Sequence, residues 1–176
     1  MIKKTFFILV LVCSQFCLFS QNHVFLGINP SVNFNRDYPS GAFDMNVLPL
    51  TIEIPIINNV DIRLISKLNY GFRTTSGALV GVGGEVGLPV YIHRGEFENN
   101  IPTGFYISPG FLYLKNVFYK HSHKAIFIEP GYNFAFKNKF GLCLGLQYGR
   151  KFLNYTDGSK LQANHFGLKI ILGFWL

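Results

Sequence analysis

Apolar and polar residues alternate at every second position through most of this chain, and this alternation constrains its fold more than any other feature. Between 140 and 148, for example, Phe140, Leu142, Leu144 and Leu146 are separated by smaller or polar residues. Because successive side chains of a strand point to opposite faces, the pattern predicts strands with one apolar face. It recurs in eight segments, residues 24–34, 48–56, 60–72, 80–92, 105–113, 126–136, 140–148 and 166–176.

The length of these segments separates two kinds of β-structure. Strands of ordinary globular proteins average ~5–6 residues, whereas a strand that crosses a bilayer at a steep tilt needs ~9–11. The predicted strands fall in the second class. Beyond the first twenty residues, no uninterrupted apolar run approaches the ~20 residues that a membrane-spanning helix requires. A membrane location would therefore depend on strands.

The composition of the second face favours lipid around the barrel. A soluble lipocalin-like barrel would turn its apolar face inward and cover its outside with charged residues. Here charged residues make up only 14% of the chain, against roughly 25% in an ordinary soluble domain. The second face is mostly Gly, Ser and Asn, which suit a narrow lumen. We therefore predict an all-β fold, an eight-stranded antiparallel up-and-down transmembrane β-barrel.

Isolated charges of both signs occupy this second face and are expected to pair inside the lumen. Unpaired charges would be too costly to bury, so we predict a mutually neutralising network that fills the lumen with side chains and leaves no open pore. Its predicted members are Glu53, Asp61, Arg63, Lys67, Glu85, Glu129, Lys151 and Lys169.

The start of the chain has the features of an export signal. A short basic beginning precedes the apolar stretch 5–19, and Ser20 offers a small residue for cleavage. We predict a signal peptide over 1–20 and a barrel domain over 21–176. Removing the signal lowers the formal charge from +7 to +5, because two lysines leave with it. Cys143 is then the single cysteine, so an internal disulfide is impossible.

Aromatic residues near the ends of the predicted strands suggest two belts at the membrane interfaces. One set is Phe34, Tyr70, Phe72, Tyr113, Tyr148, Phe152 and Phe166. The other is Tyr91, Phe105, Phe134, Phe136, Phe140, Phe174 and Trp175.

Turn signals fit this topology, but prolines oppose it. Short turns at Asn58–Asn59 and 137–139 would lie on the same, periplasmic side as the two chain ends. Six prolines fall inside predicted strands, where a closed barrel offers no free edge for a residue without an N–H. They are Pro30, Pro49, Pro55, Pro89, Pro109 and Pro130.

With these features the chain resembles the small outer-membrane β-barrel proteins of the OmpX-like and OmpA-barrel-like group. The resemblance rests on the signal peptide, the eight amphipathic strands and the C-terminal strand 166–176, which ends in Phe174, Trp175 and Leu176. Gln21 after the cut is similar to exported proteins of the Bacteroidota. The resemblance implies a Gram-negative outer-membrane location, contact with outer-membrane lipids and lipopolysaccharide, insertion by the barrel-assembly machinery, and a monomer.

No catalytic, cofactor or metal site emerges from the residues. His121, Ser122 and His123 with Glu129 could suggest a lipid A hydrolase, but the segment is predicted as a polar loop with Glu129 half a strand away. The glycine-rich segment 81–87 lacks the dinucleotide-binding spacing and is expected to line the lumen. The basic residues are dispersed, which argues against nucleic-acid binding.

We therefore expect a non-enzymatic barrel with a structural or surface-interaction role. Its loops for a surface partner would be residues 35–41, 73–77, 116–122 and 154–162. The alternatives are a lipid-modifying barrel hydrolase, a narrow pore and a soluble secreted binding barrel.

Overall fold

The computed structural model describes residues 24–33, 43–57, 59–72, 77–92, 95–97, 101–117 and 121–176. The predicted signal peptide lies outside the described residues, as do Phe34, Asn58, the loop 35–41 and most of the loop 73–77. The strands are β1 (Phe25–Ile28), β2 (Val32–Asn33), β3 (Phe43–Asn46), β4 (Leu50–Ile57), β5 (Val60–Phe72), β6 (Gly77–Gly87), β7 (Val90–Tyr91), β8 (Gly95–Phe97), β9 (Ile101–Asn116), β10 (His121–Ala135), β11 (Phe140–Tyr155) and β12 (Lys160–Trp175).

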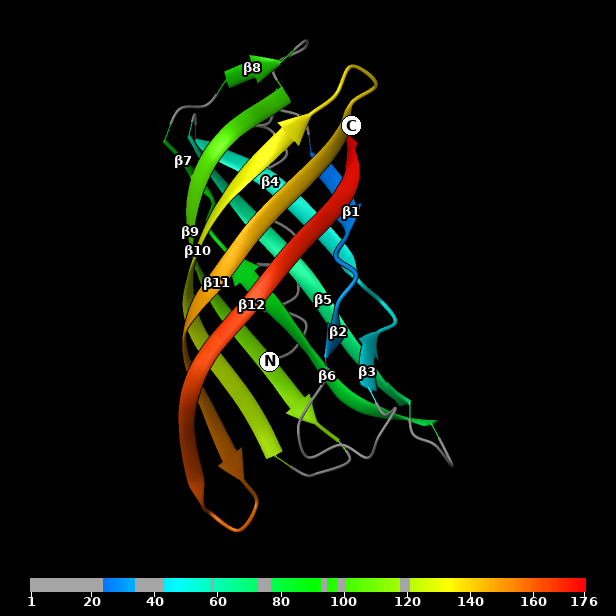
Figure 1. Ribbon diagram of the computed structural model, residues 1–176, viewed down its shortest axis with the longest axis vertical. Coiled ribbons are helices and arrows are strands. Elements are labelled where there is room, and N and C mark those ends of the chain that lie inside the picture. Colours follow the sequence, from blue (N-terminus) through cyan, green and yellow to red (C-terminus); the bar gives the residue numbers. More distant parts are fainter. Residues whose placement is uncertain are drawn as a thin grey trace, which may run out of the picture.

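These segments form a closed antiparallel barrel of eight strands, which confirms the predicted barrel topology (Figure 1). β1 with β2, β3 with β4, and β6 with β7 are three interrupted barrel strands, and β5, β9, β10, β11 and β12 are continuous. Neighbours along the chain pair with one another, and β12 closes the barrel on β1, where Phe25 lies opposite Trp175. β8 adds a short hairpin to the first residues of β9.

The apolar faces of the strands point outward. Along β12, Leu168 and Phe174 are exposed, whereas the intervening Lys169 and Trp175 are buried inside the barrel. The same alternation holds in β4, β9 and β11, so the predicted orientation of the two faces is confirmed. The arrangement with the apolar face lining an internal cavity is not the one adopted. We call this outward-facing apolar surface the apolar band; along β12 it runs from Phe166 to Phe174.

Four of the six prolines lie where pairing is interrupted. Pro30, Pro49 and Pro89 occupy the gaps between β1 and β2, β3 and β4, and β6 and β7. Pro55 lies at a register shift between β4 and β5. Bulges and breaks are the places where a residue without an N–H is tolerated within a sheet. The prolines thus account for the irregular half of the barrel.

The nitrogens of the other two prolines face interruptions in the pairing with a neighbouring strand. The N–H and C=O of a strand residue point toward the same neighbour, and the carbonyl of Pro109 accepts a hydrogen bond from Leu88 N at 3.0 Å. Its nitrogen therefore faces the gap between β6 and β7. The ladder between β10 and β11 skips Glu129 and Pro130. A closed barrel is compatible with these prolines because the missing donors fall at such points.

A bulge in β6 corrects one predicted face. Asn69 lies opposite Gly81, but the next residue, Tyr70, lies opposite Leu79, so Val80 is an extra residue in β6. Such a bulge reverses the orientation of the side chains beyond it. Leu79 is consequently exposed and Val80 buried, whereas the sequence pattern had placed Val80 on the outward face.

Strands extend into two of the predicted loops. β9 continues to Asn116 and β10 starts at His121, so His121, Ser122 and His123 belong to a strand and not to a polar loop. β11 and β12 continue to Tyr155 and from Lys160, with hydrogen bonds across the turn between Tyr155 and Ser159. The predictions were wrong because they ended each strand where its outward face became polar.

The C-terminus, the start of β1 and the 137–139 turn lie at one end of the barrel. Phe136 and Phe140 close this turn by backbone hydrogen bonds, with Lys139 in the left-handed region at φ 62°. Trp175 N donates to Lys139 O and Leu176 N to Val24 O, which ties the C-terminus and the first described residue, Val24, to the same end. We call it the end that carries the termini, with Val24 standing for the start of the described chain. Within the described residues, no helix is long and apolar enough to cross a membrane.

Candidate functional site

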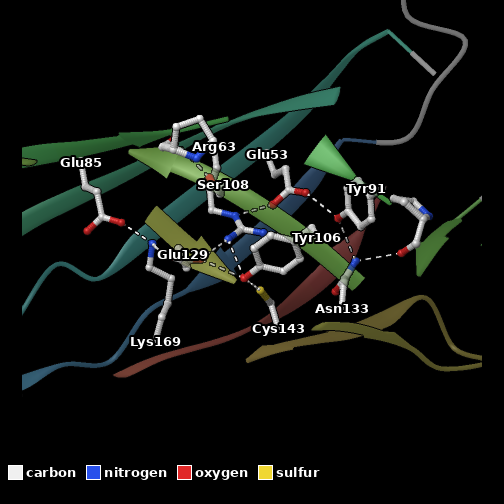
Figure 2. A network of polar contacts seen from close by, with 12 residues as sticks. Glu53, Arg63, Glu85, Tyr91, Tyr106, Ser108, Glu129, Asn133, Cys143 and Lys169 are labelled. Carbon is white, nitrogen blue, oxygen red and sulfur yellow. Dashed lines mark hydrogen bonds and ion pairs between the residues drawn. The ribbon is translucent and has the colours of Figure 1, made fainter. Parts of the chain in front are cut away.

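The most distinctive site is a polar network across the middle of the lumen, and Arg63 is at its centre (Figure 2). Arg63 projects inward from β5 and is 2% exposed. Its Nε donates to Glu53 Oε2 at 2.5 Å, and its Nη1 donates to Glu129 Oε1 at 3.0 Å and to Tyr106 Oη at 3.2 Å. One guanidinium therefore joins β4, β9 and β10 across the lumen. Its planar, multiply donating head suits a bridge between two carboxylates.

Lys169 extends the network on the other side of Glu129. Its Nζ lies 2.5 Å from Glu129 Oε2 and also pairs with Glu85 Oε1. Gln147 Nε2 donates to both carboxylates, at 2.9 Å to Glu129 and 3.0 Å to Glu85. Lys67 Nζ lies 3.8 Å from the second oxygen of Glu85. Residues from β5, β6, β10, β11 and β12 are therefore held together here.

The paired charges cancel. Glu53, Glu85 and Glu129 carry three negative charges, and Arg63, Lys67 and Lys169 carry three positive ones, which leaves a net charge of zero. Buried ions are tolerated when they are paired and their remaining donors and acceptors are satisfied. Six of the eight predicted members are thus brought together, and the expectation of mutual pairing is met for these six.

The remaining two predicted members differ from these six. Asp61 is fully buried and faces inward from β5, two residues before Arg63. Lys151 is only half-buried and lies on β11 opposite Ala125 and Ala163, and the described residues give it no ion pair. Because barrel strands are staggered, two inward residues on different strands can lie at different depths. Lys151 lies nearer the end that is opposite the termini.

Uncharged side chains that the sequence did not single out complete the network. Tyr106 Oη donates to Glu129 Oε1 at 2.9 Å and lies 3.0 Å from Cys143 Sγ. Tyr91 Oη donates to Glu53 Oε1 at 3.0 Å, and Asn133 Nδ2 lies 3.4 Å from the same hydroxyl. Both tyrosines are 1% exposed. The alternation could have placed Tyr106 inward, because it lies between the outward residues Phe105 and Ile107.

Glycines on the lumen face make the room that these side chains fill. A Cβ built at Gly145 would lie 2.9 Å from Glu129 Cγ, and one built at Gly131 would lie 2.4 Å from the ring of Tyr106. The predicted lumen lining by 81–87 is confirmed for Gly81, Gly83 and Gly87, whereas Gly84 faces outward on β6. The glycines therefore leave space for larger side chains from adjacent strands.

Next to the network, aromatic and aliphatic side chains fill the end of the lumen that carries the termini. Phe25 and Trp175 pack with ring centroids 5.1 Å apart and are both 2% exposed. Trp175 and Tyr91 were predicted in an outward aromatic belt, and both predictions are wrong because both side chains point inward. The remaining described belt residues include Phe105, Tyr148, Phe166 and Phe174, which are exposed on the outside.

Two histidines and a lysine face the lumen nearer its opposite end. His123 and His165 face inward with Lys151, and His165 Nε2 lies 3.1 Å from Gln147 Oε1. His123 lies on β10 beyond Lys124, outside the apolar band. Burial, and to a smaller extent the nearby positive charge of Lys151, lowers the pKa of His123 from its ordinary 6.5 to about 4.

His121, Ser122, His123 and Glu129 do not come together as the catalytic residues of a hydrolase. Adjacent strand residues point to opposite faces, so Ser122 faces outward while His121 and His123 face the lumen. Glu129 is engaged by Arg63, Lys169 and Tyr106. Among the described residues, no group of three or more His, Cys, Asp or Glu side chains could hold a metal ion. The polar residues of the network join neighbouring strands to one another.

Comparisons with known protein families, with curated proteins and with solved structures gave no match.

Proposed function

We propose that this chain is exported and spans an outer membrane as a non-enzymatic barrel whose lumen is filled by protein side chains. Its role would be structural support of the envelope or presentation of its outer end to a surface partner. The observation that carries the proposal is the inside-out distribution of side chains, with an apolar outside and a charged, hydrogen-bonded inside.

The outward surface supports a lipid environment. Thirty-five large apolar side chains are exposed among the described residues, whereas only twelve apolar residues form the buried core. Exposed apolar patches beyond a few hundred Å² are rare on soluble monomers and mark membranes or partner proteins. Along β12 the apolar band covers nine residues, from Phe166 to Phe174, close to the ~9–11 residues of a membrane barrel strand.

The lumen supports a structural role over transport. Arg63, Glu129 and Lys169 cross the barrel at one depth, and Trp175, Phe25 and Tyr91 fill the section next to it. A pore would require a continuous aqueous path past both layers. If such a path exists, Glu53→Ala should change the single-channel conductance measured in a planar bilayer. If the protein conducts no ions with or without this substitution, the result supports the plugged barrel.

The resemblance to small outer-membrane barrels supports the proposed location. In this location the termini and the 137–139 turn would lie on the periplasmic side, and the opposite end, where residues of β9–β12 extend past the apolar band, would lie outside the cell. Insertion by the barrel-assembly machinery and a monomeric state belong to the same proposal.

Gel mobility of the outer-membrane fraction tests the proposal. A closed membrane barrel resists detergent until it is boiled, so unboiled protein should migrate faster than boiled protein. The variant Arg63→Ala should weaken the lumen network. The fast-migrating band should therefore disappear at a lower temperature than in the wild type. Recovery of the chain as a soluble protein, with no heat-dependent mobility, would contradict the membrane location. A change in the lipid A mass profile on Ser122→Ala would instead favour the hydrolase.

A further inference from the structure

A groove interrupts the apolar band over β5, β6 and β9. It encloses about 500 Å³ between the outward side chains of Leu64, Val86 and Phe111. Small residues form its floor: Gly84 has no side chain, and Ser66 donates its hydroxyl to the backbone carbonyls of Leu48 and Leu50. A Cβ at Gly84 would meet only the carbonyl oxygen of Ile65, at 3.3 Å. The groove is therefore apolar and open toward the surroundings of the barrel.

Three cations lie next to this groove, at the edge of the apolar band farther from the termini. We call Lys115, Lys124 and Arg150 the cationic patch; they face outward from β9, β10 and β11 and are exposed. Lys115 lies opposite Ser122, and Arg150 lies opposite Ile126. Each is thus diagonal to Lys124, a relation that separates Cα atoms by about 7–8 Å. The patch forms a row across three adjacent strands.

The described residues provide no carboxylate to neutralise this patch. Five described carboxylates are buried, namely Asp44, Glu53, Asp61, Glu85 and Glu129. Asp157 lies in the turn after β11 and accepts hydrogen bonds from Ser159. Glu96 belongs to the hairpin of β8 with the first residues of β9, at the end that carries the termini. Arg150 Nη1 donates to Asn164 Oδ1 at 3.1 Å, but none of the three cations has an ion pair among the described residues. Three like charges held close together in this way favour the binding of an anion.

Tyr113 connects the patch to the groove. On the outward surface its neighbours across the strands are Gly84 on β6 and Lys124 on β10. It also borders a second recess of about 600 Å³, which is lined by Lys115, Ser122, Asn154 and Thr156. The surface thus runs from the apolar groove, past the ring of Tyr113, to cations and hydroxyl groups. An anionic lipid has the same order, from its acyl chain to its charged head group.

We propose that this surface binds a phosphate-bearing lipid, with an acyl chain in the groove and the phosphate on the cationic patch. The proposal depends on the proposed membrane location, because the lipid must surround the barrel. With the termini in the periplasm, the patch lies at the outer leaflet. Phosphate oxygens accept hydrogen bonds from guanidinium and ammonium groups, and the Tyr113 ring lies at the height where amphipathic rings are favoured.

Native mass spectrometry of the full chain in detergent tests the proposal with two probes. One is diphosphorylated lipid A, and the other is the same lipid after removal of its phosphates. The triple variant Lys115→Gln, Lys124→Gln and Arg150→Gln should bind the phosphorylated probe roughly a hundredfold more weakly, since each cation near an anionic surface contributes about fivefold. Lys137→Gln, which removes a cation from the opposite end, should leave binding unchanged.

A second variant separates the two halves of the site. Gly84→Leu fills the groove and should weaken both probes alike while the preference for phosphate remains. Equal affinity for the two probes, or wild-type binding by the triple variant, would overturn the proposal. Inorganic phosphate that competes at the concentration of the lipid itself would also overturn it, in favour of a free anion site. If the protein shows heat-dependent gel mobility but no preference for the phosphorylated lipid, only this lipid-binding proposal is wrong. If it shows no heat-dependent mobility, the proposed membrane location is wrong.

Discussion

Replacing Arg63 by Ala removes the one cation that lies between Glu53 and Glu129. Glu53 then keeps the hydrogen bond from the hydroxyl of Tyr91, whereas Glu129 keeps Lys169, Gln147 and Tyr106. The network is left with three carboxylates against two cations. Breaking a buried ion pair by deleting one partner costs about 3–5 kcal/mol, because the other charge stays buried. We expect Arg63→Ala to lower the free energy of unfolding by that amount.

Urea titration of the barrel refolded into lipid vesicles, followed by gel mobility, measures this loss. The double variant Arg63→Met with Glu53→Gln leaves two carboxylates against two cations, so it should recover a large part of the stability, as coupled neighbours do. Lys151→Met removes a half-buried lumen lysine that has no ion pair among the described residues, and it should cost under about 1 kcal/mol. An equally small loss for Arg63→Ala would refute the reasoning, since it would mean that water fills the lumen and screens its charges.

Two further predictions concern other parts of the barrel. Gly83→Ala should destabilise the barrel by more than about 2 kcal/mol, because its Cβ would lie 2.0 Å from the carbonyl oxygen of Tyr113; Gly84→Ala, on the open side, should cost under about 1 kcal/mol, and equal melting temperatures for the two would contradict this. His123 should titrate at about pH 4 by NMR. Because its folded pKa lies below the unfolded value, its contribution to stability should be complete above about pH 6.5 and lost as the pH falls toward 4. The free energies of unfolding of the wild type and His123→Gln should therefore diverge in that pH window. Parallel pH dependences would argue against a buried neutral ring.

The alternation in the sequence was sufficient to predict the barrel and the orientation of most side chains. A closed sheet leaves only two environments, so a period of two maps directly onto inside and outside. Glu53, Arg63, Glu85, Glu129 and Lys169 were identified on this basis, because each interrupts a glycine-rich or polar face. Their pairing followed from the cost of isolated buried charge.

The errors have physical causes that one strand alone does not reveal. Phe174 and Trp175 are adjacent, so only one of them can face outward; aromatic character outweighed that rule in the prediction. Lys151 shares the inward face, but its depth depends on the stagger between strands. The position of Val80 depends on a bulge. Register and bulges arise from pairing between strands, which local sequence does not encode.

The central claim is that the apolar band faces lipid while the lumen is filled by protein, and the single tryptophan tests it most directly. In vesicles of lipids with brominated acyl chains, Trp175 should be quenched little, because it is buried in the lumen against Phe25. Phe174→Trp combined with Trp175→Phe moves the indole one residue, to the outward face, where quenching should be strong. Strong quenching of Trp175 would mean that the faces are reversed, and weak quenching at both positions would mean that the barrel is not in the bilayer.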